Sequence, residues 1–197
     1  MKVKYYGNSS FLFKGKKTKL ITNPLDNEVK VNLKKVLPDI IVQSHEAKIP
    51  TGEYYMIKAP GEYEVHDFFI YGYKSDTNAQ NSDQAEIYLI DVEGVHVGLI
   101  DKSVENVRGR ILDEMGIVDV LCISLAEQSG MKLTKITDLV NKIEPYIVIP
   151  MDYNKKLLED FAKVVGVQEL EEVKDFEVTK ADFDSEEMSM RIVVLQK

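Results

Sequence analysis

A histidine that follows a short apolar run is the first residue in this sequence whose position favours chemistry. His45 comes three residues after Ile40, Ile41 and Val42, whose β-branched side chains predict a buried strand. The sheet holds the backbone at a strand end, and the side chains of the next loop can project into a cleft. Imidazole in such a position can bind a metal ion or act as a base. We therefore treat the loop after this strand as the centre of a candidate site.

Nearby serines offer a different chemistry. Ser9, Ser10 and Ser44 could supply a nucleophile that His45 activates, but no Gly-x-Ser-x-Gly turn accompanies any of them. No glycine-rich phosphate-binding loop occurs either. A serine hydrolase is therefore not favoured.

Four other polar residues are better explained by structure than by chemistry. Glu46 is expected to be solvated, and Glu62 belongs to a turn, so they do not predict a catalytic carboxylate pair. His66 lies in a turn, and His96 alternates with apolar neighbours in a strand, which predicts a side chain that points outward.

Short strands fill the first part of the sequence, and strands alternate with helices in the second. Within the first part, residues 26–37 favour an irregular or partly helical connection, and near the end of the sequence the acidic segment 169–187 is weakly patterned. One-sided apolar stripes predict three helices, at residues 104–115, 132–143 and 154–165. Such stripes need a sheet to bury them. The pattern therefore predicts an α/β (α+β) fold in which two mixed sheets pack together with helices outside, as one domain over residues 1–197.

Composition restricts the classes of partner. The formal net charge of -8 argues against a nucleic-acid or an anionic-membrane surface. A lone cysteine, Cys122, lies in an apolar run and is expected to be an inert core thiol. With no signal-like N-terminal segment and no long apolar run, the sequence predicts a cytoplasmic protein, whose partner would be another protein or a second copy of the chain.

Four segments, taken in order, resemble the lactonase-like branch of the metallo-β-lactamase superfamily. Residues 6–12 (Tyr-Gly-Asn-Ser-Ser-Phe-Leu) resemble its Gly-His-Ser-x-Phe, and residues 20–24 (Leu-Ile-Thr-Asn-Pro) resemble its Leu-Ile-Asp-Pro. Residues 60–65 (Pro-Gly-Glu-Tyr-Glu-Val) match a turn of its small members. Residues 143–153 resemble Ile-x-Pro-x-x-x-Ile-Pro-Met-His-Tyr. The resemblance implies an αββα sandwich with a one- or two-metal hydrolytic site.

Carried over residue by residue, the resemblance places His45, Asp101 and Asp152 at ligand positions, the last in place of a histidine. One imidazole and two carboxylates could hold one Zn²⁺, Mn²⁺ or Fe²⁺ ion. The alternative is structural: His45 is hydrogen-bonded at its strand end, and the two aspartates accept bonds from backbone amides of the following turns.

The other ligand positions that the resemblance implies hold residues unsuited to the role. Ala47, Ile49 and Pro50 stand where the His-x-His-x-Asp-His loop would continue after its first histidine. Gly98 stands for the histidine of a His-x-Gly-Asp segment, and Asn8 for that of the first motif.

Two hypotheses about function follow. The first is a non-catalytic pseudo-hydrolase that serves as a binding or assembly module and needs no cofactor. The second is a single-metal hydrolase of a small phosphorylated or lactone-like substrate. They differ in ligand count, since a hydrolytic metal site needs about three protein ligands and an open position.

Residues 75–84 hold no large apolar side chain, so they predict a flexible surface loop. We expect deletion of the loop centre to change the free energy of unfolding little, because no packed contact would be lost. Urea denaturation of the deletion variant measures this. Strong amide protection of this segment in hydrogen exchange would contradict the prediction.

Overall fold

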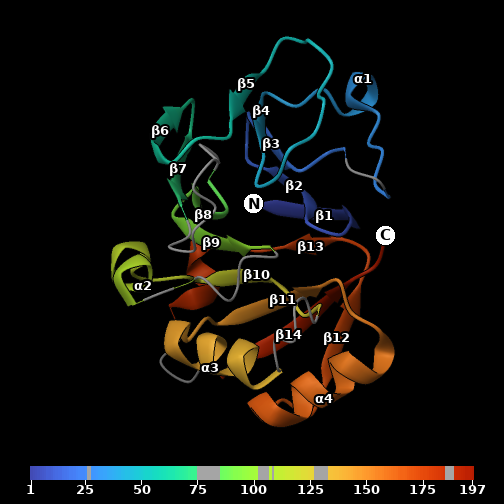
Figure 1. Ribbon diagram of the computed structural model, residues 1–197, viewed down its shortest axis with the longest axis vertical. Coiled ribbons are helices and arrows are strands. Elements are labelled where there is room, and N and C mark those ends of the chain that lie inside the picture. Colours follow the sequence, from blue (N-terminus) through green and yellow to red (C-terminus); the bar gives the residue numbers. More distant parts are fainter. Residues whose placement is uncertain (26–27, 75–84, 102–106, 108, 127–132, 185–188) are drawn as a thin grey trace.

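Two β-sheets pack face to face, and helices cover the outside of one of them (Figure 1). The computed structural model describes residues 1–25, 28–74, 85–101, 107, 109–126, 133–184 and 189–197. Within these residues the six-stranded sheet has the order β13 (Phe176–Glu177), β1 (Lys2–Gly7), β2 (Ser10–Lys14), β3 (Lys19–Thr22), β4 (Ile40–Val42) and β5 (Tyr55–Ile57). The eight-stranded sheet has the order β12 (Leu170–Val173), β14 (Arg191–Leu195), β11 (Ile147–Met151), β10 (Val120–Ser124), β9 (Val95–Ile100), β8 (Ile87–Val92), β7 (Phe68–Tyr73) and β6 (Gly61–Val65). The predicted sandwich of two mixed sheets is confirmed.

Strand pairing follows the change of pattern along the sequence. The β6–β7–β8–β9 strands form antiparallel hairpins, and Glu93 and Gly94 both adopt positive φ in the turn between β8 and β9. From β9 onward the pairs β9–β10, β10–β11 and β11–β14 are parallel. Every residue of β10 and β11 is buried, as their continuous apolar sequences predict for central strands.

The core between the sheets is rich in aromatic residues. Phe11 and Phe13 from β2, Phe68 from β7 and Tyr88 from β8 are fully buried in it. Cys122 lies in the same core, and its burial raises the pKa of the thiol above the ordinary value. The thiol therefore stays protonated, in line with its expected inert role.

The three long helices all cover the eight-stranded sheet (Figure 1). They are α2 (Gly109–Met115), α3 (Leu133–Ile143) and α4 (Lys155–Val165). The expected start of the first helix at residue 104 is wrong, because Val107 is not helical; residues 104–106 lie outside the described part. The predicted start depended on Val104 and Val107, and two apolar residues three positions apart are too few to predict where a helix begins. Among the described residues no helix is long and apolar enough to cross a membrane.

The outer face of the six-stranded sheet has a much thinner cover. In the described residues its only helix is the four-residue α1 (Leu33–Val36), capped by Asn32 and ended by Leu37 in a left-handed conformation. This helix lies within the connection at residues 26–37 that was expected to be irregular or partly helical. A small outer cluster around Ile21 and Ile41 completes the cover.

The acidic segment after α4 has more structure than its sequence indicates. It contributes β12 to one sheet, β13 to the other, and a 3-10 helix, η2 (Lys180–Phe183). β12 and β13 are edge strands, and neither shows a run of alternating apolar and polar residues: β12 has two exposed residues between two half-buried ones, and β13 has only two residues, of which Phe176 is buried. The segment therefore bridges the two sheets. The predicted loop at residues 75–84 lies outside the described residues.

Two lysine ion pairs fasten this bridging segment. The ammonium of Lys180 lies 3.1 Å from the fully buried carboxylate of Asp119, whereas Lys2 and Glu177 form an exposed pair at the same distance of 3.1 Å. We expect Lys180→Met to lower the free energy of unfolding by about 1–3 kcal/mol, because Asp119 would lose a charged partner. Lys2→Met, the matched control, should change it by less than about 1 kcal/mol. Urea denaturation tests both, and equal losses would contradict the prediction.

Candidate functional site

Two hydroxyl groups and a carboxylate form a buried cluster where loops of the two sheets meet. Asp101 follows β9 of the eight-stranded sheet, and one of its oxygens, Oδ2, accepts hydrogen bonds from Ser9 Oγ at 2.9 Å and Ser44 Oγ at 3.1 Å. Ser9 lies in the turn between β1 and β2, and Ser44 lies just after β4. All three residues are buried. The donors in the described residues are therefore side-chain hydroxyls, not the backbone amides that we expected.

Asn23 ties the two serines together. Its Nδ2 donates to both Ser9 Oγ and Ser44 Oγ at 2.9 Å, and its Oδ1 accepts from the backbone N–H of Ser44 at 2.9 Å. Each hydroxyl thus accepts from the amide and donates to the carboxylate, so the hydrogens of both hydroxyls are used within the cluster. Asn23 occupies the position of the aspartate in the Leu-Ile-Asp-Pro pattern.

His45 approaches the same carboxylate from the loop after β4. Its Nδ1 lies 3.5 Å from Asp101 Oδ2, a distance at the outer limit of a hydrogen bond. Both ring nitrogens are buried without a hydrogen-bond partner among the described residues, and so is the second carboxylate oxygen, Asp101 Oδ1. Of the three predicted site residues, the structure thus brings His45 and Asp101 together.

The cluster changes the acidity of its carboxyl group. Burial by itself raises the pKa of Asp101, but the contact with His45 and the hydroxyl donors of Ser9 and Ser44 outweigh it, so that the pKa lies below the ordinary value. Asp101 is therefore an anion at neutral pH.

Asp152 lies in a neighbouring pocket of about 670 Å³ that Tyr5, Asn8 and Tyr153 also line. It follows β11, and its Oδ2 accepts a hydrogen bond from Ser124 Oγ at 3.0 Å. Burial, and next the charge of Asp152, raise the pKa of Tyr5. The described residues contain no group of three or more His, Cys, Asp or Glu side chains that could hold a metal ion, so Asp152 does not complete such a group with His45 and Asp101.

Three loops at the site hold a non-glycine residue in the left-handed region. The φ angles are 48° for Asn8, 40° for Asn23 and 54° for Asp152. Asn and Asp tolerate this region better than other residues, yet such conformations still have an energetic cost and gather at functional sites. This end of the sandwich is therefore the part of the structure whose backbone most indicates a site.

The prediction that Gly98 stands at a metal-ligand position is wrong. A Cβ atom built on Gly98 would lie 3.1 Å from Val118 Cγ1 and 3.2 Å from Leu121 Cδ1, inside the layer between sheet and helices. Side chains alternate along a strand, and residue 98 is three positions from Asp101, so the two face opposite sides of the sheet. A histidine at position 98 could not reach Asp101.

Two residues of the loop after His45 have apolar surroundings. Ile49 packs against the cluster of Ile21 and Ile41 on the outer face of the six-stranded sheet, and Pro50 lines a pocket on that face. Ala47 contributes its carbonyl oxygen, which accepts from Gln43 Nε2 at 3.4 Å. These three positions supply no side-chain donor atom.

The remaining candidates have structural roles. Glu46 is exposed, as expected. Glu62 is exposed too, but the prediction that it belongs to a turn is wrong, because it lies within β6 and pairs with Tyr71 of β7. His66 lies in the turn after β6 with a φ of 56°, and its ring meets Tyr55 edge-on. His96 is half-buried instead of fully outward, because its Nδ1 lies 3.2 Å from the buried Asp119.

Sequence reasoning considered Ser9 and Ser44 only as nucleophiles and missed their role as donors to Asp101. It also missed the bridging role of Asn23. The available signal was that all three polar residues directly follow or join short apolar strands, as His45 does.

Comparisons with known proteins agree with this geometry. A family model described as the beta-lactamase superfamily domain matches residues 2–152. No curated protein matches the sequence. Among solved structures, a metallo-β-lactamase superfamily protein from Thermotoga maritima is 18% identical with a TM-score of 0.74, over 98% of this chain and 97% of that one. Igni18, a metallo hydrolase from Ignicoccus hospitalis, is 15% identical with a TM-score of 0.61, over 90% and 99%. YhfI of Bacillus subtilis, a metallo-β-lactamase fold protein, is 13% identical with a TM-score of 0.63, over 83% and 92%.

The lowered pKa of Asp101 predicts a pH-dependent contribution to stability. A carboxyl group with a depressed pKa stabilises the fold above its unfolded pKa and loses that effect as pH falls through the folded pKa. We expect Asp101→Asn to be less stable than the wild type at neutral pH, and the difference to shrink as pH falls below the ordinary value of 3.8. Urea denaturation at several pH values measures it. A difference that stays constant to low pH would contradict the prediction.

Proposed function

The chain belongs to the beta-lactamase superfamily domain family, and from this premise we propose that it is a non-catalytic member, which uses the sandwich as a binding or assembly module. The observation that supports the proposal is the hydrogen bonding of Asp101. Its Oδ2 already accepts from two buried hydroxyl groups, which Asn23 holds in place. A cation at Oδ2 would have to displace these donors.

The side chains around Asp101 do not fit a hydrolytic metal centre. Asp101 Oδ1 and the His45 ring are the atoms there without a hydrogen-bond partner in the described part of the chain, and together they supply two ligands. A metal that activates water needs about three protein ligands that are held rigidly. Asp152 instead bonds to Ser124 and lines the neighbouring pocket. We therefore assign no hydrolytic step to this site.

One observation favours a second candidate function. The unpartnered Asp101 Oδ1 and His45 nitrogens are atoms that bind Zn²⁺, Mn²⁺ or Fe²⁺ readily, and buried polar atoms without a partner have an energetic cost. A third ligand would have to come from Asp152, which lines the neighbouring pocket. The chain would then be a single-metal hydrolase of a small phosphorylated or lactone-like substrate.

Metal content separates the two functions. We expect protein purified without chelator to hold well under one transition-metal ion per chain by elemental analysis. Added Zn²⁺ or Mn²⁺ should leave the melting temperature unchanged. An ion that binds only the native state would raise the free energy of unfolding, by about 2.7 kcal/mol when its free concentration is a hundred times Kd, and the melting temperature would rise with it.

His45→Ala and His66→Ala provide the matched pair for this test. Under the non-catalytic proposal, the two variants and the wild type contain equally little metal and hydrolyse neither a phosphodiester nor a lactone. A stoichiometric ion that disappears together with hydrolysis in His45→Ala, but persists in His66→Ala, would establish the hydrolase instead.

A further inference from the structure

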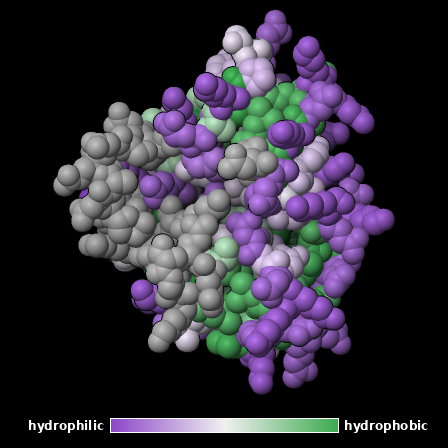
Figure 2. Space-filling view, turned by 45° about the vertical axis from the view of Figure 1, so that its right-hand side comes forward, coloured by the Kyte–Doolittle hydropathy of each residue, from purple (hydrophilic) through white to green (hydrophobic). Residues whose placement is uncertain are grey.

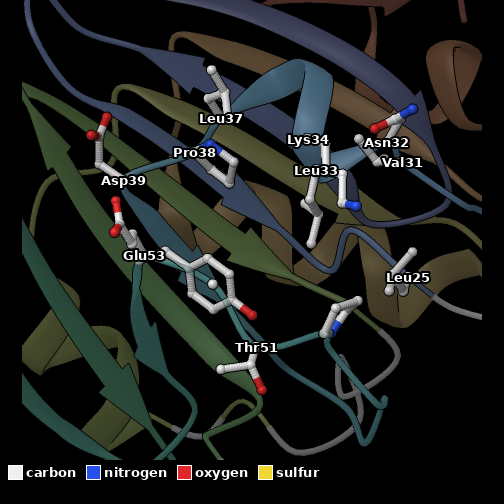
Figure 3. Close-up of a pocket in the computed structure, with 13 residues that line it drawn as sticks. Leu25, Val31, Asn32, Leu33, Lys34, Leu37, Pro38, Asp39, Thr51 and Glu53 are labelled. Atoms are coloured by element: carbon white, nitrogen blue, oxygen red, sulfur yellow. The ribbon is translucent and has the colours of Figure 1, made fainter.

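The outer face of the six-stranded sheet carries a second pocket, which residues other than those of the Asp101 cluster line. The pocket has a volume of about 580 Å³ and lies between α1 and residues 50–54 (Figure 3). Its wall is mostly apolar, with Leu33, Pro38 and Tyr54 among the lining residues. Figure 2 shows a hydrophobic area bordered by hydrophilic side chains in the upper half of the view, where the six-stranded sheet lies.

Leu37 at the edge of this pocket is unfavourable for an isolated chain in two ways. Its φ of 50° is left-handed, a conformation that helix ends usually reserve for glycine and that is strained in other residues. Its side chain is also 66% exposed. The sequence thus keeps a leucine where glycine or asparagine would fit the backbone better, and the leucine projects into solvent.

Apolar exposure continues along the sheet edge next to Leu37. In the described residues β5 is the last strand of the sheet, and its Met56 is 38% exposed. Met56 pairs with Ile41 of the outer cluster, so it points to the same side of the sheet as the pocket, whereas Tyr55 points to the inner side, where its ring meets His66. Methionine is enriched in the centre of protein interfaces.

Charges on the two sides of the pocket are of opposite sign. Lys34 projects from α1, whereas Asp39 and Glu53 lie on the other side of the opening (Figure 3). Lys34 and Glu53 are exposed, and neither forms an ion pair with another described residue. A twofold axis sets the same face of two copies against each other, so Lys34 of one copy can meet the Glu53 carboxylate of the other.

We propose that this face binds the same face of a second copy of the chain, in a twofold dimer where Leu37 of each copy enters the pocket of the other. Lys34 then faces Glu53 across the axis. A projecting residue and a recess on one surface can fill each other when two copies meet. A small molecule in the pocket would leave Leu37 and Met56 in water, so the second copy explains more of the face.

Analytical ultracentrifugation over a range of concentrations tests the proposal. The wild type should form a dimer. Leu37→Asn should raise the dimer Kd at least about tenfold, because a polar side chain replaces the apolar one in the pocket. Asn tolerates the left-handed conformation, so the monomer should melt no lower than the wild type. Ile117→Asn, at a residue 68% exposed beyond α2, is the matched control and should leave the Kd unchanged.

A charge exchange tests the orientation of the two copies. Lys34→Glu and Glu53→Lys should each weaken the dimer, since each creates a like-charge contact across the axis. The double variant should restore the Kd, which an unrelated surface effect would not do.

The proposal is overturned by a wild type that stays monomeric at every concentration, including one that carries a bound small molecule in native mass spectrometry. It is equally overturned by a dimer that Leu37→Asn leaves intact, which would place the interface elsewhere. Neither outcome depends on metal content, so the dimer and the proposed non-catalytic function can fail separately.

Discussion

A carboxylate buried where two sheets meet must be hydrogen-bonded, and this requirement organises the site. Asp101 comes from the eight-stranded sheet, whereas Ser9 and Ser44 come from loops of the six-stranded sheet. An ionised group without partners in that position would destabilise the fold by several kcal/mol, roughly the size of total domain stability. The donors therefore fix the two loops against the end of β9, and Asn23 fixes the donors.

The same contacts supply the partners of the Asp101 carboxylate from within the protein. Two hydroxyl groups and an imidazole contact meet its Oδ2. The loop that carries His45 continues to Ile49, which packs on the outer face of the six-stranded sheet. That packing helps to shape the pocket beside α1. The chemistry of the site and the shape of the outer face are thus linked through one loop.

A second buried carboxylate, that of Asp119, anchors the end of the chain in another part of the sandwich. Asp119 precedes β10 and accepts from the backbone N–H of His96 at 2.8 Å and from Lys180. Lys180 belongs to the segment that bridges the sheets, so this carboxylate anchors the end of the chain. The two buried aspartates both join elements distant in sequence. Of the two, only Asp101 keeps a carboxylate oxygen without a hydrogen-bond partner among the described residues.

The sequence by itself determined most of the strands, though not β12 and β13, together with the helices α3 and α4 and the family resemblance, because apolar periodicity and turn residues act over a few neighbouring positions. It also placed His45 and Asp101 as candidates. Only the tertiary structure decided that Gly98 faces the helices, that Ser9 and Ser44 bond to Asp101, and that the acidic tail joins both sheets. Which face a side chain takes depends on strand register, and which donors meet a buried charge depends on how distant loops fold together. Neither is encoded in local pattern.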